Sequence, residues 1–143
     1  MERRRVVITG QGAVTPLGLT AGESWQGVLE GCCGIGPITA YDPAGMKVQL
    51  AAEVKGFNPD ALFGKPESKR MGRFTQFALA AAREALADSG FRVESADGAR
   101  CGVIVSSGIG GIGITEEEHD RGLARGWDRV SPFFIPTGIC NMA

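Results

Sequence analysis

Residues 6–18 read Val6-Val7-Ile8-Thr9-Gly10-Gln11-Gly12-Ala13-Val14-Thr15-Pro16-Leu17-Gly18, a β-branched run that breaks into a turn of glycine and other small residues. The same design returns as Val103-Ile104-Val105-Ser106-Ser107-Gly108-Ile109-Gly110-Gly111-Ile112-Gly113. Short β-branched runs are typical of buried strands, and glycines at their ends permit a positive φ or a close backbone approach. Because α/β proteins place their sites at such strand ends, the pattern predicts an α/β fold with functional residues near both turns.

The composition fits one globular domain. The chain has 143 residues, of which 43% are hydrophobic and 22% are charged, and its formal net charge is -1. That charge excludes a globally basic nucleic-acid binder. The N-terminal Met1-Glu2-Arg3-Arg4-Arg5 is followed by an apolar run too short for a signal peptide, and no other run approaches membrane-spanning length. We therefore expect a cytoplasmic protein that binds neither nucleic acid nor membrane.

The cysteines predict neither a metal site nor a disulfide. They are Cys32, Cys33, Cys101 and Cys140. None has CxxC spacing, and the chain's single histidine, His119, offers no ligand cluster, so structural zinc is not expected. We expect free thiols that act as small buried or half-buried side chains.

Local signals in the first half predict short elements. The sequence Thr20-Ala21-Gly22-Glu23 fits a capping box, which predicts a helix that ends at Gly31. Residues 48–54 predict a strand. Asn58-Pro59 predicts the start of a short helix that ends near Gly64.

The clearest predicted helix runs from about Glu67 to Ser89 and is closed by Gly90. One stripe of this helix carries Met71, Phe74, Ala78, Ala81 and Ala85. Its C-terminal half is almost all alanine, which lets a neighbouring segment pack closely. Further on, Thr115 with Glu116, Glu117 and Glu118 predicts the cap of an acidic helix.

A nucleotide site is the first function that the glycines suggest. Residues 108–113 satisfy G-x-G-x-x-G between a predicted strand and a predicted helix. However, a dinucleotide fold needs an acidic residue at the end of a second strand about twenty positions on, and no β run lies there. The earlier turn lacks a third glycine and carries Pro16, and no Gly-Lys-Ser/Thr follows either turn. Dinucleotide binding stays open as the weaker alternative.

Several motifs, taken together, resemble a known family. They are Arg4 with residues 6–12, Thr15-Pro16-Leu17-Gly18, Lys69-Arg70-Met71, Gly108-Ile109-Gly110-Gly111, Ser131-Pro132-Phe133-Phe134-Ile135-Pro136 and Asn141-Met142. In order and spacing they resemble the N-terminal part of the 3-oxoacyl-[acyl-carrier-protein] synthase II family, the elongating condensing enzymes of bacterial fatty-acid synthesis. The resemblance covers the whole chain.

The resemblance implies a thiolase-like α/β fold: two similar βαβ-rich halves in stacked α-β-α-β-α layers, assembled as a homodimer. Residues 1–143 would form most of the N-terminal half and stop before the nucleophile. The family's nucleophilic cysteine, its two catalytic histidines and its lysine would all follow Ala143, so we expect no catalytic residue here and no activity from this chain alone. Cys140 precedes the family's nucleophile strand and His119 matches no catalytic role, which favours structural roles for both.

The family's activity is the elongation of acyl-[acyl-carrier-protein] with malonyl-[acyl-carrier-protein] by decarboxylative Claisen condensation, without cofactor or metal. Under the resemblance, Ile109 and Phe134 match acyl-pocket positions, although both could be ordinary core residues. Lys65, Lys69, Arg70 and Arg73 lie within nine positions, and this basic patch would steer the acidic carrier protein by charge; the alternative is a solvated basic face. A basic helix start is electrostatically unusual, because the positive end of the helix dipole favours acids.

Two departures and one further alternative remain. Gly72 stands where relatives more often carry an acid, and Pro66 where they often carry a base. A homologous non-catalytic subunit that determines chain length beside a condensing enzyme of polyketide type would share the same motifs. The residue at the nucleophile position of the full-length gene distinguishes the two, because a cysteine there supports the enzyme.

Overall fold

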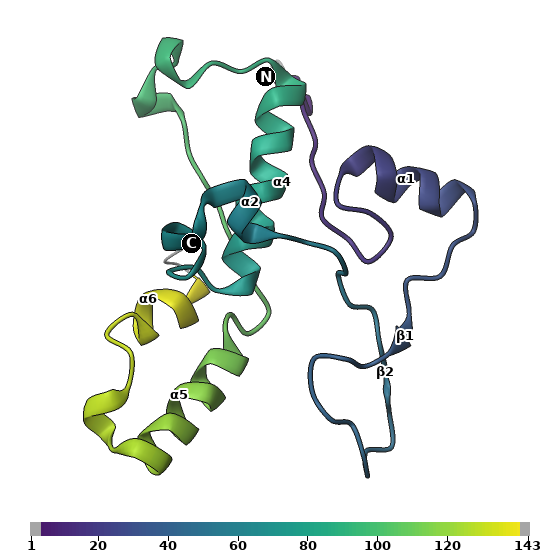
Figure 1. The fold of residues 1–143 in the computed structure, drawn as a ribbon. Helices are drawn as coiled ribbons and strands as arrows, with labels where there is room; N and C mark the ends of the chain where they lie inside the picture. Colours follow the sequence, from purple (N-terminus) through teal and green to yellow (C-terminus); the bar gives the residue numbers. More distant parts are fainter. Residues whose placement is uncertain (1–3, 141–143) are drawn as a thin grey trace. The chain divides into compact units, whose positions relative to one another are not determined.

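The computed structural model describes residues 4–140, so Asn141 and Met142 of the motifs above lie outside the described residues. The chain divides into two compact units, which are described separately. The first comprises Met1–Phe57 and Ala80–Val93, and the second comprises Asn58–Leu79 and Glu94–Ala143. Helix α4, Arg73–Ser89, contributes residues to both units (Figure 1).

Helix α1 of the first unit, Ala21–Leu29, confirms the predicted capping signal. The Thr20 side chain accepts a hydrogen bond from the Glu23 N–H at 3.1 Å. In return, the Glu23 carboxylate accepts from the Leu19 N–H at 2.7 Å, one residue before the partner that a full capping box uses. The helix ends at Leu29, and Gly31 follows with φ at 69°, as the glycine predicted.

The only sheet within residues 4–140 is a short antiparallel pair, β1 (Gly36–Pro37) with β2 (Leu50–Ala51). The strand predicted over residues 48–54 therefore forms only at its centre. Beyond β2, the Glu53 carboxylate accepts from the Thr39 hydroxyl at 2.6 Å and from the backbone N–H groups of Thr39 and Ala40. These hydrogen bonds, led by the one from the Thr39 side chain, hold the pKa of Glu53 below its ordinary value.

The β-branched runs 6–8 and 103–105 were expected to be buried strands, and this is wrong for the structure. Neither run is a strand, and Val6, Ile8 and Ile104 are 93%, 90% and 97% exposed. A strand needs a neighbour to pair its backbone N–H and C=O groups, and no segment of the described chain pairs with either run. Among the described hydrophobic side chains, Phe57 alone is buried.

The alanine-rich half of α4 packs closely against the first glycine turn, as predicted. A Cβ at Gly10 or Gly12 would overlap the carbonyl oxygens of Ala85 and Ala81, so the turn's backbone lies directly on the helix. The Glu84 carboxylate accepts from the Ala13 N–H at 2.9 Å and from the Ala21 N–H at 2.9 and 3.1 Å. One side chain of α4 thus fixes both the turn and the start of α1.

Two short helices open the second unit. Helix α2, Pro59–Phe63, is capped by the Asn58 side chain, which accepts from the Ala61 N–H at 3.2 Å, and it ends at Gly64, as predicted. Helix α3, Lys65–Ser68, follows at once.

The long helix predicted from about Glu67 is interrupted, so its predicted start is wrong. Residues 69–72 separate α3 from α4, and Gly90, with φ at 65°, closes α4 as expected. The buried Gln76 amide donates to the Ser68 carbonyl at 2.9 Å and to the Met71 carbonyl at 3.4 Å. At the break, the Ser68 carbonyl thus accepts from this side chain as well as from the Met71 N–H at 3.3 Å.

The remaining regular elements of the described chain are helical, whereas residues 101–111 form neither helix nor strand. Two 3-10 turns, η1 (Val93–Ser95) and η2 (Gly98–Arg100), lead to α5 (Ile112–Arg125), a third 3-10 turn, η3 (Trp127–Arg129), and α6 (Phe134–Gly138). The predicted cap at Thr115 is wrong, because its N–H already bonds the Gly111 carbonyl at 3.2 Å inside the first turn. Over the described part of the chain, no helix has both the length and the apolar content that a membrane crossing requires.

The cysteines are free thiols, as expected, but they are less buried than predicted. Cys32, Cys33 and Cys101 are exposed, and Cys140 is half-buried. The vicinal pair lies just after α1 and Cys101 just after η2, where the described chain provides no layer to cover them.

Candidate functional site

The segment that carries Phe134 is organised by its own polar side chains. The Ser131 hydroxyl accepts from the Phe133 N–H at 3.1 Å, and the Ser131 carbonyl accepts from the Phe134 N–H at 3.0 Å. At the other end of the turn, the Thr137 hydroxyl donates to the Phe133 carbonyl at 2.6 Å. These bonds give α6 a defined start, with Phe134 as its first residue.

Helix α5 holds this segment at both ends. Glu118, which is 7% exposed, accepts from the Ser131 N–H at 2.7 Å, and its other carboxylate oxygen accepts from the Arg121 guanidinium at 2.5 Å. At the far end, the Gly111 N–H donates to the Gly138 carbonyl at 2.9 Å. The position of α6 therefore depends on two contacts with α5.

A cavity of about 290 Å³ lies between these elements. Its lining consists of Thr115, Glu118, His119, Trp127, Val130 and Phe134. The rings of His119 and Trp127 meet edge to face with their centroids 6.0 Å apart. The cavity surface is almost wholly apolar, which suits an apolar group more than a charged one.

The structure does not bring the two predicted acyl-pocket residues together. Phe134 is half-buried and lines the cavity, whereas Ile109 lies before α5, is 73% exposed and is not part of the lining. Within the described residues, Ile109 is not part of a core. The acyl-pocket role of both residues stays a prediction.

The predicted docking residues lie on α3 and the turn after it. Lys65 is the first residue of α3 and Lys69 is its C-cap, and both are exposed. Among the described acids, none lies within ion-pair distance of either lysine. Arg70 differs, because it pairs with Glu67 at 3.7 Å and lies over the Phe133 ring at 5.4 Å. Two cations of this surface are thus available to a partner, and the third is held by its own unit.

Arg73 and Gly72 complete the basic turn. Arg73 stacks over the Phe77 ring at 4.6 Å, and burial lowers the pKa of its guanidinium. Gly72 is buried, and a Cβ there would overlap the Thr137 carbonyl oxygen and stand 2.7 Å from the Phe74 ring. The glycine that departs from the family pattern therefore lets this turn pack tightly against α6.

The second glycine turn uses two of its backbone N–H groups within its own unit. The Gly110 N–H donates to the Ser107 hydroxyl at 2.9 Å, and the Gly111 N–H is taken by Gly138. A dinucleotide fold leaves such N–H groups at the helix start for the pyrophosphate. The positive φ of Gly110, 76°, and the close approach to Gly138 explain these glycines without a nucleotide.

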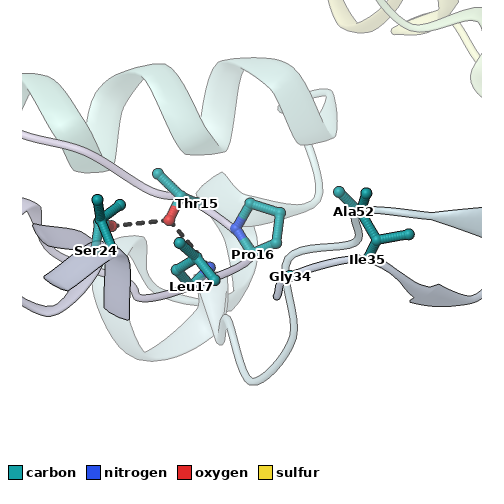
Figure 2. Close-up of a pocket in the computed structure, with 8 residues that line it drawn as sticks. Thr15, Pro16, Leu17, Ser24, Gly34, Ile35 and Ala52 are labelled. Atoms are coloured by element: carbon teal, nitrogen blue, oxygen red, sulfur yellow. Dashed lines mark hydrogen bonds between the residues drawn. The ribbon is translucent and has the colours of Figure 1, made fainter. Parts of the chain in front are cut away.

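A separate apolar pocket of about 270 Å³ lies in the first unit (Figure 2). Its lining consists of Thr15, Pro16, Leu17, Ser24, Val28, Gly34, Ile35 and Ala52. The hydroxyls of Thr15 and Ser24 hydrogen-bond each other at 2.8 Å, and the Leu17 N–H donates to Thr15 at 3.1 Å. No titratable side chain lines this pocket, so its lining offers no base to activate the Thr15 or Ser24 hydroxyl.

The described residues do not assemble a catalytic or metal centre. No group of three or more His, Cys, Asp or Glu side chains between residues 4 and 140 could hold a metal ion. His119 contacts Asp120 at 3.5 Å and Trp127, and no base within residues 4–140 lies within hydrogen-bond distance of the Cys140 thiol. That neither residue is catalytic stays a prediction.

Sequence reasoning missed the carboxylates that organise both units, Glu84 and Glu118. The run of acids at 116–118 was interpreted as a helix cap, and only Glu118 of the three is buried. Its spacing from the buried Gly122 indicates an inward face of α5 and could have distinguished it. Glu84 lies among the alanines of α4, where a single acid on a small-residue face was the available signal.

Comparisons with known proteins cover nearly the whole chain. Residues 3–143 match the family described as "Beta-ketoacyl synthase, N-terminal domain". The "3-oxoacyl-[acyl-carrier-protein] synthase 2" proteins of Coxiella burnetii and of Synechocystis sp. are 43% and 41% identical over 143 residues. This is 100% of this chain and 34% of each relative, so the chain spans about a third of their length.

Solved structures similar to this chain are ketosynthases as well. "The ishigamide ketosynthase/chain length factor" has a TM-score of 0.79 and 29% identity, covering 96% of this chain and 34% of that chain. A "Beta-ketoacyl synthase from Burkholderia phymatum STM815" has a TM-score of 0.77 and 27% identity, covering 98% of this chain and 35% of that chain. The thiolase-like α/β fold expected from the resemblance is confirmed by these ketosynthase neighbours.

Proposed function

This chain belongs to the β-ketoacyl synthase family, and on that premise we propose that it is the N-terminal part of a 3-oxoacyl-[acyl-carrier-protein] synthase. The complete protein would elongate an acyl-carrier-protein thioester with malonyl-carrier protein by decarboxylative Claisen condensation. The observation that carries the proposal is the identity of 40% to 43% with synthases of this name from four bacterial genera, over 99% or more of the chain.

The chemistry of the proposal lies mostly outside these residues. A thiolate cysteine takes the acyl group from the carrier, and the enolate formed by decarboxylation of malonyl-carrier protein then attacks the acyl carbon. No described side chain fits the nucleophile or its bases, and the chain spans 34% of its relatives. We therefore place the nucleophile in the part of the relatives' length that this chain does not span.

The proposed roles of this chain are substrate and partner binding. Phe134 would face the acyl chain from its cavity, and Ile109, now exposed, would join it when further structure covers the second glycine turn. Each methylene buried against such residues contributes about 0.8 kcal/mol, which is enough to select chain length. We further propose a cytoplasmic homodimer, the arrangement that the family resemblance implies.

We propose that Lys65 and Lys69 dock the carrier protein. Exposed lysines without an intramolecular partner attract an acidic protein at long range and guide its approach. A solved ketosynthase neighbour, 21% identical, is described as a type II polyketide acyl-carrier protein in complex with its ketosynthase. Arg70 contributes charge to the same surface, but its stacking on Phe133 also gives it a structural role.

Reversing both lysines tests this docking surface. In the full-length protein, Lys65→Glu with Lys69→Glu is expected to raise KM for the acyl-carrier protein about tenfold, since two reversed contacts sum to about 1.4 kcal/mol. The rate with small acyl thioesters should not change, because only carrier docking uses this surface. Lys47→Glu with Lys55→Glu, two exposed lysines of the first unit, is the matched control. An unchanged KM would make Lys65 and Lys69 a solvated face.

The expected inactivity of the 143 residues alone is a separate prediction. Purified chain should neither decarboxylate malonyl-carrier protein nor transfer an acyl group, because residues 4–140 assemble no nucleophile with a base. Both reactions can be followed by mass spectrometry of the carrier. Turnover that disappears in Cys140→Ala would contradict the structural role of Cys140.

One observation favours a second candidate function. A solved neighbour at 29% identity is described as a ketosynthase/chain length factor, so a non-catalytic chain-length subunit is compatible with this fold. The codon at the nucleophile position of the full-length gene separates the two candidates. A cysteine there supports the condensing enzyme, and any other residue supports the partner subunit.

A further inference from the structure

We propose that Glu118 is a positioning residue for acyl-chain selection, acting through its hold on the segment that carries Phe134. The inference rests on the proposed condensing function. It adds a residue that sets where the cavity wall stands through its hold on the Ser131 backbone.

The Glu118 side chain is buried, whereas the neighbouring acids on α5 are exposed. Its side chain is 9% exposed, whereas Glu116 and Glu117 are exposed. A buried carboxylate is costly unless both of its oxygens are hydrogen-bonded. Here Oε2 accepts from the Ser131 N–H at 2.7 Å and Oε1 accepts from the Arg121 guanidinium at 2.5 Å. One of the two hydrogen bonds that the buried carboxylate requires therefore fixes the backbone at Ser131.

The fixed backbone determines the position of Phe134. Ser131 accepts from the N–H groups of both Phe133 and Phe134, so a shift of Ser131 moves the first residue of α6. The opposite end of α6 is held independently, by the bond between Gly111 and Gly138. Glu118 and Phe134 also line the same cavity. Loss of the Glu118 contact would therefore tilt the phenylalanine end of α6 and change the cavity rather than detach the helix.

The Arg121 contact does not explain the role. The Arg121 guanidinium satisfies Oε1 of Glu118, but Arg121 lies on α5 itself, so this pair does not hold the segment that carries Phe134. The contact that matters is the one to the Ser131 N–H, which would otherwise be left without an acceptor. Only a group that reaches Ser131 can replace Glu118.

The test compares acyl-chain profiles of the full-length protein. The ratio of kcat/KM for a long-chain acyl-carrier protein to that for a short-chain one is measured in wild type and variants. Glu118→Leu is expected to change this ratio at least about fivefold, because the Ser131 N–H loses its acceptor. Glu118→Gln keeps an amide oxygen for Ser131 and should stay within about twofold of wild type. Glu117→Leu, on the exposed face of the same helix, is the control and should leave the ratio unchanged.

Glu118→Asp covers the case in which Glu118→Leu does not fold. It keeps the charge but is one methylene shorter, so its hold on Ser131 weakens and the ratio should shift at least about twofold in the same direction. A uniform loss at all chain lengths, or an equal shift in Glu117→Leu, overturns the role of Glu118. A folded wild type that condenses no acyl chain overturns the proposed function itself, which is a distinguishable failure.

Discussion

Gly12→Ala is expected to lower the free energy of unfolding by about 2 to 5 kcal/mol, as overpacking and a lost hydrogen bond add together. The new Cβ would overlap the Ala81 carbonyl oxygen and stand 2.9 Å from both the Ala85 nitrogen and the Glu84 Cβ. Helix backbone cannot move aside as a flexible side chain can. The turn must shift instead, and the bond from the Ala13 N–H to Glu84 would weaken with it.

Gly22→Ala is the matched control for this prediction. Gly22 lies inside α1, and a Cβ there would meet nothing within 4 Å. Alanine is the better helix former, so this variant should gain about 0.5 to 1 kcal/mol. Urea unfolding of the two variants in the full-length protein gives the comparison. Equal stabilities for Gly12→Ala and Gly22→Ala would show that the turn does not lie on α4 as described.

Glu84→Ala is expected to cost about 3 to 5 kcal/mol, because two backbone N–H groups lose a charged acceptor. The groups are those of Ala13 and Ala21, which belong to the turn and to the first residue of α1. A carboxylate at a helix start is also favoured by the helix dipole, so the loss at Ala21 has an electrostatic part. Glu84→Gln should lower the free energy of unfolding by about half as much as Glu84→Ala, since its amide has a single acceptor oxygen.

Asp88→Ala provides the graded comparison one turn along the same helix. Asp88 accepts from the exposed Gln11 N–H, at 3.0 Å, so its removal should cost about 0.5 to 1 kcal/mol. Hydrogen exchange at Ala13 and Ala21 should accelerate in Glu84→Ala and stay near wild type in Asp88→Ala. If the two variants lose the same stability, Glu84 does not fix the turn.

The helices were predictable where a nearby capping residue or glycine marks their start or end. Thr20 before α1, Asn58 before α2 and Gly90 after α4 each satisfy or end a helix through residues a few positions away, so a short stretch of sequence contains the whole signal. The strands were not predictable in the same way. A β-branched run becomes a strand only when another segment pairs with it, and residues 6–8 and 103–105 find no such partner within the described chain.

In the candidate site too, the features with a local sequence signal were predictable and those that depend on distant contacts were not. The positions of Lys65, Lys69 and Phe134 followed from motifs, and the structure places the lysines on an exposed face and Phe134 in a cavity wall. The break at residues 69–72 and the role of Glu118 did not follow, because both depend on contacts with residues far along the chain. No local pattern shows that Gly72 must meet Thr137 or that Glu118 must meet Ser131.

The Glu84 contact also imposes an order on assembly. Ala13 and Glu84 are 71 positions apart, and at about 5 to 20 residues per second the ribosome needs about 4 to 14 s to add the residues that separate them. During that time, the first glycine turn is synthesised, but the Ala13 N–H lacks its Glu84 acceptor and no helix lies beneath Gly10 and Gly12. Packing of the turn that opens the sequence is therefore a late event in folding, because it requires α4.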